Sequence, residues 1–502
     1  MSIGETPFGL SKSKFLAGRQ CLKRLYLKIH EPENVPEADE AQQAQFDLGY
    51  EVGSLATKRF SGGVLVDEDY LHHADAVART QKLMADKHVP AIFEAAFSYQ
   101  GVKVRVDILE RQPGNRWRMV EVKSTSKLKD THYDDVAIQK YVLEGCGLEL
   151  SEACLMHLNR EYVYEGGEYV LENLFVINDL SADLEEISKK IPELLKDQQR
   201  ILGLSEPPEV QPGDHCADPS ECEFYAMCNP EVPQHWVGHL PGIRKQKIKE
   251  LFDQGIELIH DIPEDFGLTD LQSRACLCVK NGEPYIGKEI QGKLRGLQYP
   301  LYFMDFETCN PAIPRYAGMR PFDQIPFQWS VHIQRQPGGE LEHHEFLAAN
   351  SDDPREDFIE GLLEVINGGG GKGHIVSYYA SFETGRLDDL AAWLPKYASK
   401  IEKVKNRLWD LHPVIRDYVY HPEFYGSFSL KAVLPALVPH MTYDSMEVAD
   451  GIAAGLAYNR MIRAGLPESE LTNLRDALLK YCGQDTLAMV ELINSLRSRA
   501  TS

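Results

Sequence analysis

The sequence predicts an α/β protein with an N-terminal and a C-terminal α/β domain joined by a helical linker. Strand-like and helix-like segments alternate, and closely spaced acidic residues end strand-like runs near positions 121 and 305. A chain of 502 residues should hold about three domains, on a prior near 150 residues each. We therefore expect domains at 1–232, 233–295 and 296–502.

Composition limits the classes of function. The net charge of −23 argues against a protein that coats nucleic acid non-specifically, although a groove can be locally basic. No apolar run reaches bilayer length, and the N-terminus lacks the basic start and apolar core of an export signal. We expect a cytoplasmic protein with no membrane partner. In that setting the ten cysteines are not a disulfide framework.

Two predicted strands carry the first group of reactive side chains. Apolar and polar residues alternate in 102–108 and again in 117–122, and a Pro-Gly-Asn turn separates the two segments. Because strand side chains alternate between faces, Glu121 and Lys123 point the same way. Asp107 can lie opposite them on the neighbouring strand.

This arrangement suits metal-assisted cleavage of a phosphodiester. We expect Asp107 and Glu121 to hold Mg²⁺ or Mn²⁺, with the Val122 carbonyl as a third oxygen ligand. The cation would polarise the scissile phosphate, while Lys123 orients the attacking water or offsets developing charge. The competing interpretation is a β-hairpin with a solvated Glu–Lys pair.

A helix-like stretch at 133–143 follows these strands. With Asp107 and the Glu-Val-Lys segment 121–123, it resembles the RecB-like branch of the PD-(D/E)XK nuclease superfamily, in which a Gln…Tyr helix follows the E-x-K strand. The resemblance implies a PD-(D/E)XK fold. It also implies these catalytic or site-lining residues: Asp107, Glu121, Lys123, Gln139 and Tyr141.

The chain departs from this family at one metal ligand. RecB-like nucleases often carry a histidine in the preceding helix, which is predicted here at 38–60, but this sequence has Gly53 at that position. Glu51 and the His72-His73 pair are the alternatives that remain. Glu94 is a further accessory candidate.

Four cysteines form a candidate cofactor site. Cys216, Cys222 and Cys228 are spaced C-x5-C-x5-C, and three thiols need a fourth ligand to complete a tetrahedral set. Cys21 is the natural candidate. It lies within 11–30, which is predicted to be one basic amphipathic helix able to contact phosphates. The basic residues of that helix are Lys12, Lys14, Arg19, Lys23, Arg24 and Lys28.

One early and three late cysteines resemble the arrangement in iron–sulfur RecB-like nucleases. The resemblance implies that a [4Fe–4S] cluster is bound by Cys21, Cys216, Cys222 and Cys228 and staples the two ends of the domain together. Zinc is the alternative metal, although structural zinc sites show closer C-x2-4-C pairs. Three buried thiols without metal are the third interpretation.

The linker contains one motif. Residues 240–256 resemble a helix–hairpin–helix-like element, in which a Pro-Gly turn opens a basic helix whose amides can meet a phosphate. A small helical linker with a basic face is an equally good interpretation.

A second group of acids lies in the C-terminal domain. Asp305 and Glu307, two residues apart at the end of an apolar strand, share a face. Tyr481 and Asp485 are offset by only about 40° on a helix, so they also share a face. A strand–turn–helix segment that contains Glu383 lies between them in the sequence.

This ordered set resembles the DEDD exonucleases of the DnaQ-like, RNase H-like fold, in the subgroup with a tyrosine four residues before the last aspartate. The resemblance implies an RNase H-like domain in which Tyr481 orients the attacking water. It also implies these metal ligands: Asp305, Glu307, Glu383 and Asp485. The middle ligand is usually aspartate, so Glu383 departs from the pattern, and Asp410 is a further acidic candidate.

The joint pattern resembles a prokaryotic family that fuses an iron–sulfur RecB-like nuclease to a DnaQ-like domain. We expect an Mg²⁺- or Mn²⁺-dependent nuclease with two hydrolytic centres that acts on single-stranded DNA ends in repair or anti-phage defence. RNA is the alternative substrate. A nucleic-acid-binding scaffold with one or both sites inactive is the alternative from another class.

Overall fold

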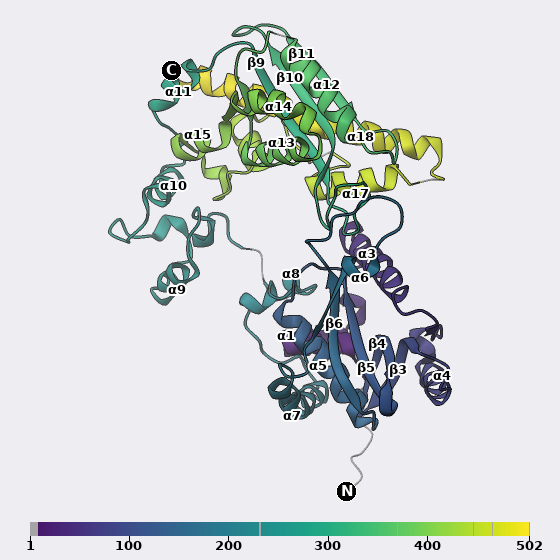
Figure 1. Ribbon diagram of the computed structural model, residues 1–502. Coiled ribbons are helices and arrows are strands. Elements are labelled where there is room, and N and C mark those ends of the chain that lie inside the picture. Colours follow the sequence, from purple (N-terminus) through teal and green to yellow (C-terminus); the bar gives the residue numbers. More distant parts are fainter. Residues whose placement is uncertain (1–8, 230–231, 369, 445, 464, 501–502) are drawn as a thin grey trace. The chain divides into compact units, whose positions relative to one another are not determined.

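The computed structural model describes residues 9–229, 232–368, 370–444, 446–463 and 465–500. Residues 1–8, which form most of the N-terminal stretch considered above, lie outside this part of the chain. Helices and strands alternate along the described residues, so the predicted α/β class is confirmed (Figure 1). No described helix is long and apolar enough to cross a membrane.

The chain divides into two compact units. The first contains residues 1–231 and 311–323, and the second contains residues 232–310 and 324–502. The expected linker at 233–295 is therefore grouped with the C-terminal residues. The segment 311–323, which lies within the expected C-terminal domain, is grouped with the first unit.

The first unit is built on a seven-stranded sheet of order β2-β3-β4-β5-β6-β7, with β1 paired to β4. Strands β3, β4 and β5 are antiparallel neighbours, while β5 and β6 are parallel. The strands are β1 (Leu10–Ser11), β2 (Val64–Leu65), β3 (Ala91–Tyr99), β4 (Val102–Gln112), β5 (Arg116–Lys123), β6 (Leu150–Leu158) and β7 (Phe175–Asp179).

Helices cover both faces of this sheet. Met119 packs in a core cluster with α1, α4, α5 and α7, whereas Val120, the next residue of β5, packs in another cluster with α3. Ala312 and Ile313 of the segment 311–323 belong to that second cluster. The helices are α1 (Lys12–Gln20), α2 (Leu22–His30), α3 (Glu40–Thr57), α4 (His73–Ala85), α5 (Asp130–Gly145), α6 (Leu171–Leu174), α7 (Glu185–Leu202) and α8 (Tyr225–Cys228).

The predicted single helix at 11–30 is wrong, because it is two helices that meet at Cys21. This residue is extended, with φ −157° and ψ 126°, and it ends α1 and precedes α2. The break matters for the site, because it turns the chain at the cysteine that was expected to bind a cofactor.

The second unit contains a five-stranded sheet of order β11-β10-β9-β12-β13 and a separate β14-β8 pair. Strand β9 is antiparallel to β10 and parallel to β12. The strands are β8 (Tyr285–Ile286), β9 (Leu301–Cys309), β10 (Ile325–Gln334), β11 (Leu341–Leu347), β12 (Ile375–Ser377), β13 (Leu408–Asp410) and β14 (Val419–Tyr420).

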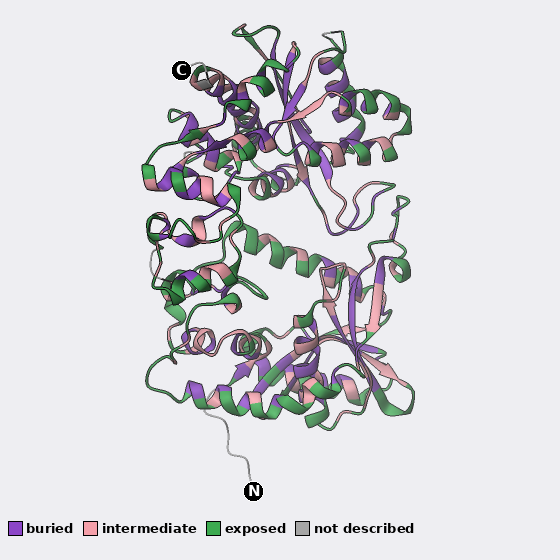
Figure 2. Cartoon of the chain, turned by 90° about the vertical axis from the view of Figure 1, so that its left-hand side faces the viewer, coloured by how far each residue is buried: buried purple, intermediate pink, exposed green. Residues whose placement is uncertain are grey.

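The central strands of this sheet are buried between helices (Figure 2). Met304 and Phe306 of β9 pack in a core cluster with α12, α13 and α14, while α17 and α18 also contact β9. The helices are α9 (Lys245–Asp253), α10 (Asp270–Asn281), α11 (Glu289–Arg295), α12 (Arg355–Asn367), α13 (Ser381–Trp393), α14 (Ala398–Lys405), α15 (Leu411–Tyr418), α16 (Leu430–Leu437), α17 (Gly451–Met461) and α18 (Glu468–Ala500).

Candidate functional site

The structure gathers charged side chains at two places, which we call the first and the second centre. The first centre lies in the first unit and consists of Lys12, Asp107, Glu121, Lys123 and Asp135. Glu121 and Lys123 come from β5, Asp107 from β4, Asp135 from α5 and Lys12 from the start of α1. Three of these five residues were expected from the sequence, whereas Asp135 and the role of Lys12 were not.

Glu121 is the hub of the first centre and is only 2% exposed. Its Oε1 accepts hydrogen bonds from Lys12 Nζ at 2.6 Å and from Lys123 Nζ at 2.8 Å. Its Oε2 accepts from Gln139 Nε2 at 2.7 Å. Asp107 is held separately, because its Oδ2 accepts from the Val122 amide at 2.6 Å. Both oxygens of Glu121 therefore already have donors.

Helix α5 explains which of its expected residues reach this centre. Asp135 and Gln139 are four residues apart and share a face, and Gln139 Nε2 lies 3.0 Å from Asp135 Oδ1. Tyr141 is two residues further on, about 200° around the helix. Its hydroxyl bonds to Gln100 and its ring packs on Tyr99, so the expectation that Tyr141 lines the site is corrected.

The charges of the first centre are largely balanced within the protein. Burial alone would raise the pKa of Glu121, but the ammonium groups of Lys12 and Lys123 outweigh it and hold the pKa below its usual range. Burial also opposes the charge of Lys12, yet Asp135 and Glu121 raise its pKa above the usual value. Asp107 differs, because burial and repulsion from Glu121 raise its pKa well above normal.

The alternatives to the missing histidine lie elsewhere. His73 is buried against Ser98 Oγ at 3.0 Å, and His72 pairs with Asp69. Glu51 is exposed on α3. Glu94 is ion-paired with Arg105 at 3.1 Å, and its repulsion contributes to the raised pKa of Asp107. The structure thus gives Asp135, rather than these residues, as the further acid.

Several basic residues of 11–30 are engaged inside the protein. Arg24 and Lys28 both pair with Glu223, and Arg19 pairs with Asp134. Lys12 is directed into the first centre. The phosphate-contacting surface expected from these residues is therefore much reduced, because ion pairs with other parts of the first unit take up four of its six charges.

The four expected cysteines come together. Cys21, Cys216, Cys222 and Cys228 all line one small pocket, with a cavity volume of about 20 Å³. The ion pairs of Arg24 and Lys28 with Glu223 hold the start of the chain against the cysteine loop. His215 also lines this pocket, with Nε2 3.7 Å from Cys216 Sγ.

The spacing of these thiols bears on the group that they could hold. A tetrahedral zinc site with bonds near 2.3 Å places its sulfur atoms roughly 3.8 Å apart. Among the described residues, Asp305, Glu307 and Cys482 form the group whose ligand atoms all lie within 4.8 Å, and no three of the four thiols form such a group. The described thiols therefore do not stand at the spacing of a loaded tetrahedral zinc site.

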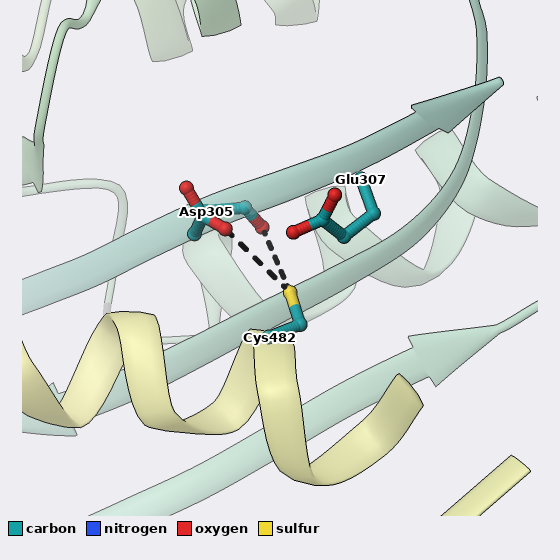
Figure 3. Close-up of side chains that lie close together, drawn as sticks. All are labelled: Asp305, Glu307 and Cys482. Atoms are coloured by element: carbon teal, nitrogen blue, oxygen red, sulfur yellow. Dashed lines mark hydrogen bonds between the residues drawn. The ribbon is translucent and has the colours of Figure 1, made fainter. Parts of the chain in front are cut away.

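The second centre lies in the second unit and consists of Asp305, Glu307, Glu383, Asp485 and Cys482. Asp305 and Glu307 alternate with the core residues of β9 and face α18 (Figure 3). Cys482 Sγ lies 3.8 Å from Asp305 Oδ2 and 3.8 Å from the Asp305 carbonyl oxygen. Glu383 enters from the first turn of α13, and Asp485 lies one turn after Tyr481 on α18.

Like charges crowd the second centre. Burial raises the pKa of Asp305 well above normal, and repulsion from Asp485, Glu307 and Glu383 adds to the effect. Burial together with Asp485 does the same to Glu307. Burial raises the pKa of Glu383 to about 8 and that of Asp485 to about 6. Glu383 Oε2 is buried and has no hydrogen-bond partner among the described residues.

Polar neighbours orient Asp485. The hydroxyl of Tyr443 donates to Asp485 Oδ1, and hydrogen bonds from Tyr443 and Tyr481 hold the pKa of Asp485 below what burial alone would give. Lys431 Nζ lies 5.9 Å from the centre of the Tyr481 ring and lowers the pKa of both Glu307 and Asp485. Tyr443 and Cys482 were not expected from the sequence.

Asp410, the further acidic candidate of the sequence analysis, holds the backbone of a turn. Its oxygens accept from the amides of Tyr379 and Ala380 at 3.1 Å and of His412 at 3.0 Å. These bonds hold the turn that precedes α13, where Tyr379 has φ 68°. Asp410 therefore positions the start of the helix that carries Glu383, and its carboxylate is occupied by backbone donors.

One comparison with known proteins gives a match. The family described as Domain of unknown function (DUF2779) matches residues 302–429. The matched segment includes Asp305, Glu307 and Glu383, and it ends before the helix that carries Asp485. The chain is similar to this family over less than half of its length. No curated protein matches the chain.

Proposed function

We propose that this protein is a nuclease that depends on Mg²⁺ or Mn²⁺ and hydrolyses phosphodiester bonds of nucleic acid in the cytoplasm. One observation carries the proposal. Four carboxylates from β9, α13 and α18 converge in the second centre; burial raises the pKa of all four, and repulsion from the other acids adds to the effect at Asp305 and Glu307. Such a cluster costs stability unless cations or protons neutralise it.

The second centre fits divalent cations. Carboxylate oxygens are the ligands that such hard cations prefer, and Glu383 Oε2, which has no hydrogen-bond partner in the described part of the chain, offers a further acceptor. When bound, such cations polarise the scissile phosphate and lower the pKa of the attacking water. Tyr481 and Tyr443 fix the carboxylate of Asp485 by hydrogen bonds, and Lys431 places a positive charge near this carboxylate and Glu307.

The first centre would supply a second hydrolytic site. Asp107 and Glu121 would hold its cation, and Lys123 carries the positive charge next to Glu121 that could meet the phosphate. The four cysteines of the first unit would hold a [4Fe–4S] cluster with a structural role, and zinc is the alternative. We propose single-stranded DNA ends as the substrate, in repair or anti-phage defence.

The test is digestion of end-labelled single-stranded DNA and RNA with Mg²⁺ or Mn²⁺, and with EDTA as the metal-free control. In a Glu121→Gln background, which silences the first centre, we expect Asp305→Asn and Asp485→Asn each to reduce the remaining cleavage at least about 100-fold, because each removes a ligand of the cations that stabilise transition-state charge. Glu121→Gln isolates any contribution of the first centre.

A matched control is Asp476→Asn, which removes an exposed acid from α18 without touching the second centre. This variant should cleave like the wild type. Cleavage of RNA in preference to DNA would make the protein a ribonuclease. Activity that survives both Asp305→Asn and Glu121→Gln in one chain would end the nuclease assignment of the two centres.

A scaffold with an inactive first centre is the second candidate. The observation that favours it is the pair of ammonium groups that already neutralise Glu121 and Asp135. In that case Glu121→Gln would leave cleavage unchanged while Asp305→Asn abolishes it.

A further inference from the structure

Lys12 lies where the acids of the first centre converge. Its Nζ is 2.6 Å from Glu121 Oε1 and 2.9 Å from Asp135 Oδ1. Lys123 Nζ contacts the same two carboxylates. Two ammonium groups thus bridge one pair of buried acids, and the side chain of Lys12 remains only 23% exposed.

The backbone around Lys12 is held firmly. Leu10, two residues before it, is fully buried and pairs with Val102 of β4. Ser11 caps α1 by accepting from the Lys14 amide at 3.3 Å. Further along α1, a Cβ on Gly18 would come within 2.5 Å of the Gln198 side chain, so the helix packs closely on α7. Lys12 therefore starts from a fixed position.

The ammonium of Lys12 competes with any metal for the same oxygens. Glu121 Oε1 accepts from both lysines and Oε2 accepts from Gln139, so a cation can approach Glu121 only if a donor leaves. The lysine of the expected catalytic set, Lys123, is two residues away on the same strand. Lys12 comes from α1, not from β5. It can therefore leave Glu121 without any change in the strand that carries Glu121 and Lys123.

We propose that Lys12 is a tethered competitor for the cation position of the first centre. Its ammonium holds Glu121 and Asp135 in the absence of a divalent cation, and the cation must displace it to bind. Lys12 is a positioning residue that sets how tightly the first centre takes its cation. This inference rests on the proposed function, because it assumes that the first centre is a cation site.

The experiment measures Mn²⁺ binding by electron paramagnetic resonance in full-length protein that carries Asp305→Asn and Asp485→Asn, so that the second centre is silenced. We expect Lys12→Met to bind Mn²⁺ about tenfold more tightly than its parent, which is about 1.4 kcal/mol. Methionine retains the length and packing of the stem without the charge. Lys12→Arg, which keeps a positive charge, should bind no more tightly than the parent.

Lys14→Met is the matched control, since it removes a charge from the same helix outside the centre. It should leave Mn²⁺ affinity within about twofold of the parent, a change below 0.5 kcal/mol. Lys12→Gln provides a second neutral variant if the methionine form does not fold, as judged by circular dichroism.

The outcomes separate the two proposals. Mn²⁺ binding that is equal or weaker in the neutral Lys12 variants overturns the competitor role and leaves the first centre as a metal site. Failure of Mn²⁺ to bind in the parent and in both neutral variants overturns the metal-site assignment of that centre and the inference with it. If Lys12→Met and Lys14→Met both bind Mn²⁺ more tightly, the gain in affinity comes from the lower positive charge of the protein, and the competitor role of Lys12 is overturned.

Discussion

The two centres use similar acids but meet opposite electrostatic conditions. In the first, ammonium groups contact Glu121 and Asp135 directly, and the pKa of Glu121 is lowered. In the second, acids repel one another, and the pKa values of Asp305 and Glu307 are raised well above normal. The comparison teaches that a carboxylate motif predicts where acidic side chains come together. Residues distant in the sequence decide whether lysines already neutralise those acids or whether a bound cation would have to do so.

The largest expected difference is in stability without metal. Glu121→Gln should lower the free energy of unfolding by about 2 kcal/mol, because it takes the anion from two ammonium groups that are about one quarter exposed. Glu383→Gln should change it by no more than about 0.5 kcal/mol near pH 7, or increase it, because the neutral amide replaces a carboxyl whose pKa of about 8 already keeps it mostly protonated. Urea unfolding in EDTA, followed by circular dichroism, measures both. A larger loss for Glu383→Gln would reverse the comparison.

The pH dependence should differ in the same sense. The folded pKa values of Glu383 and Asp485, about 8 and about 6, lie above their ordinary values of 4.5 and 3.8. Stability from these groups is therefore fully present below about pH 4 and is lost as the pH rises through 6 and then 8. We expect the metal-free second unit to lose on the order of 5 kcal/mol between pH 5 and pH 9, since Glu383 contributes over about three pH units and Asp485 over about one.

Glu121 of the first centre supplies the internal control for this experiment, whereas Asp107, whose pKa burial and Glu121 raise, should behave like the acids of the second centre. The folded pKa of Glu121 lies below its ordinary value, so its contribution is present above that value and is lost only as the pH falls through the lower folded pKa. Between pH 5 and pH 9 it should be constant. Thermal unfolding across this range, with and without Mg²⁺, tests the contrast. A second-unit transition that is flat without metal and unaffected by Glu383→Gln would contradict it.

A smaller effect is expected at Tyr443. Tyr443→Phe removes the hydroxyl that donates to Asp485 Oδ1, and a hydrogen bond to a charged group is worth about 1.5 kcal/mol. We expect cleavage to fall about tenfold and the pKa of Asp485 to rise further. Rates measured from pH 5 to pH 9 show both effects. Tyr420→Phe, in a buried tyrosine of β14, is the control and should leave rates unchanged.

Short-range geometry explains what the sequence could predict. Glu121 with Lys123, and Asp305 with Glu307, share faces because strand side chains alternate, and the structure agrees for both pairs. Helical spacing likewise explains why Tyr141 does not line the first centre: it is two positions from Gln139 on α5 and so lies on the opposite side of the helix. The break at Cys21 was missed because amphipathic spacing continues across it, although the backbone does not.

Long-range pairing explains what the sequence could not predict. Lys12 meets Glu121 across 109 residues, and no local pattern marks it among the other lysines of that segment. Tyr443 meets Asp485 across 42 residues, in a stretch without a recognisable motif. Cys482 belongs to no cysteine motif, and the packing of α18 against β9 brings it to Asp305. Asp135 could have been found, since it lies one helical turn before Gln139.

The route of the chain has a practical consequence for anyone who wishes to separate the two halves. The polypeptide passes between the units at 231–232, again at 310–311 and again at 323–324. Truncation after residue 231 would therefore strip Ala312 and Ile313 from the hydrophobic cluster beneath α3. An N-terminal fragment without this segment would expose the apolar side chains that Ala312 and Ile313 cover. A fragment intended to fold alone should therefore include residues 311–323, joined to it by a designed linker.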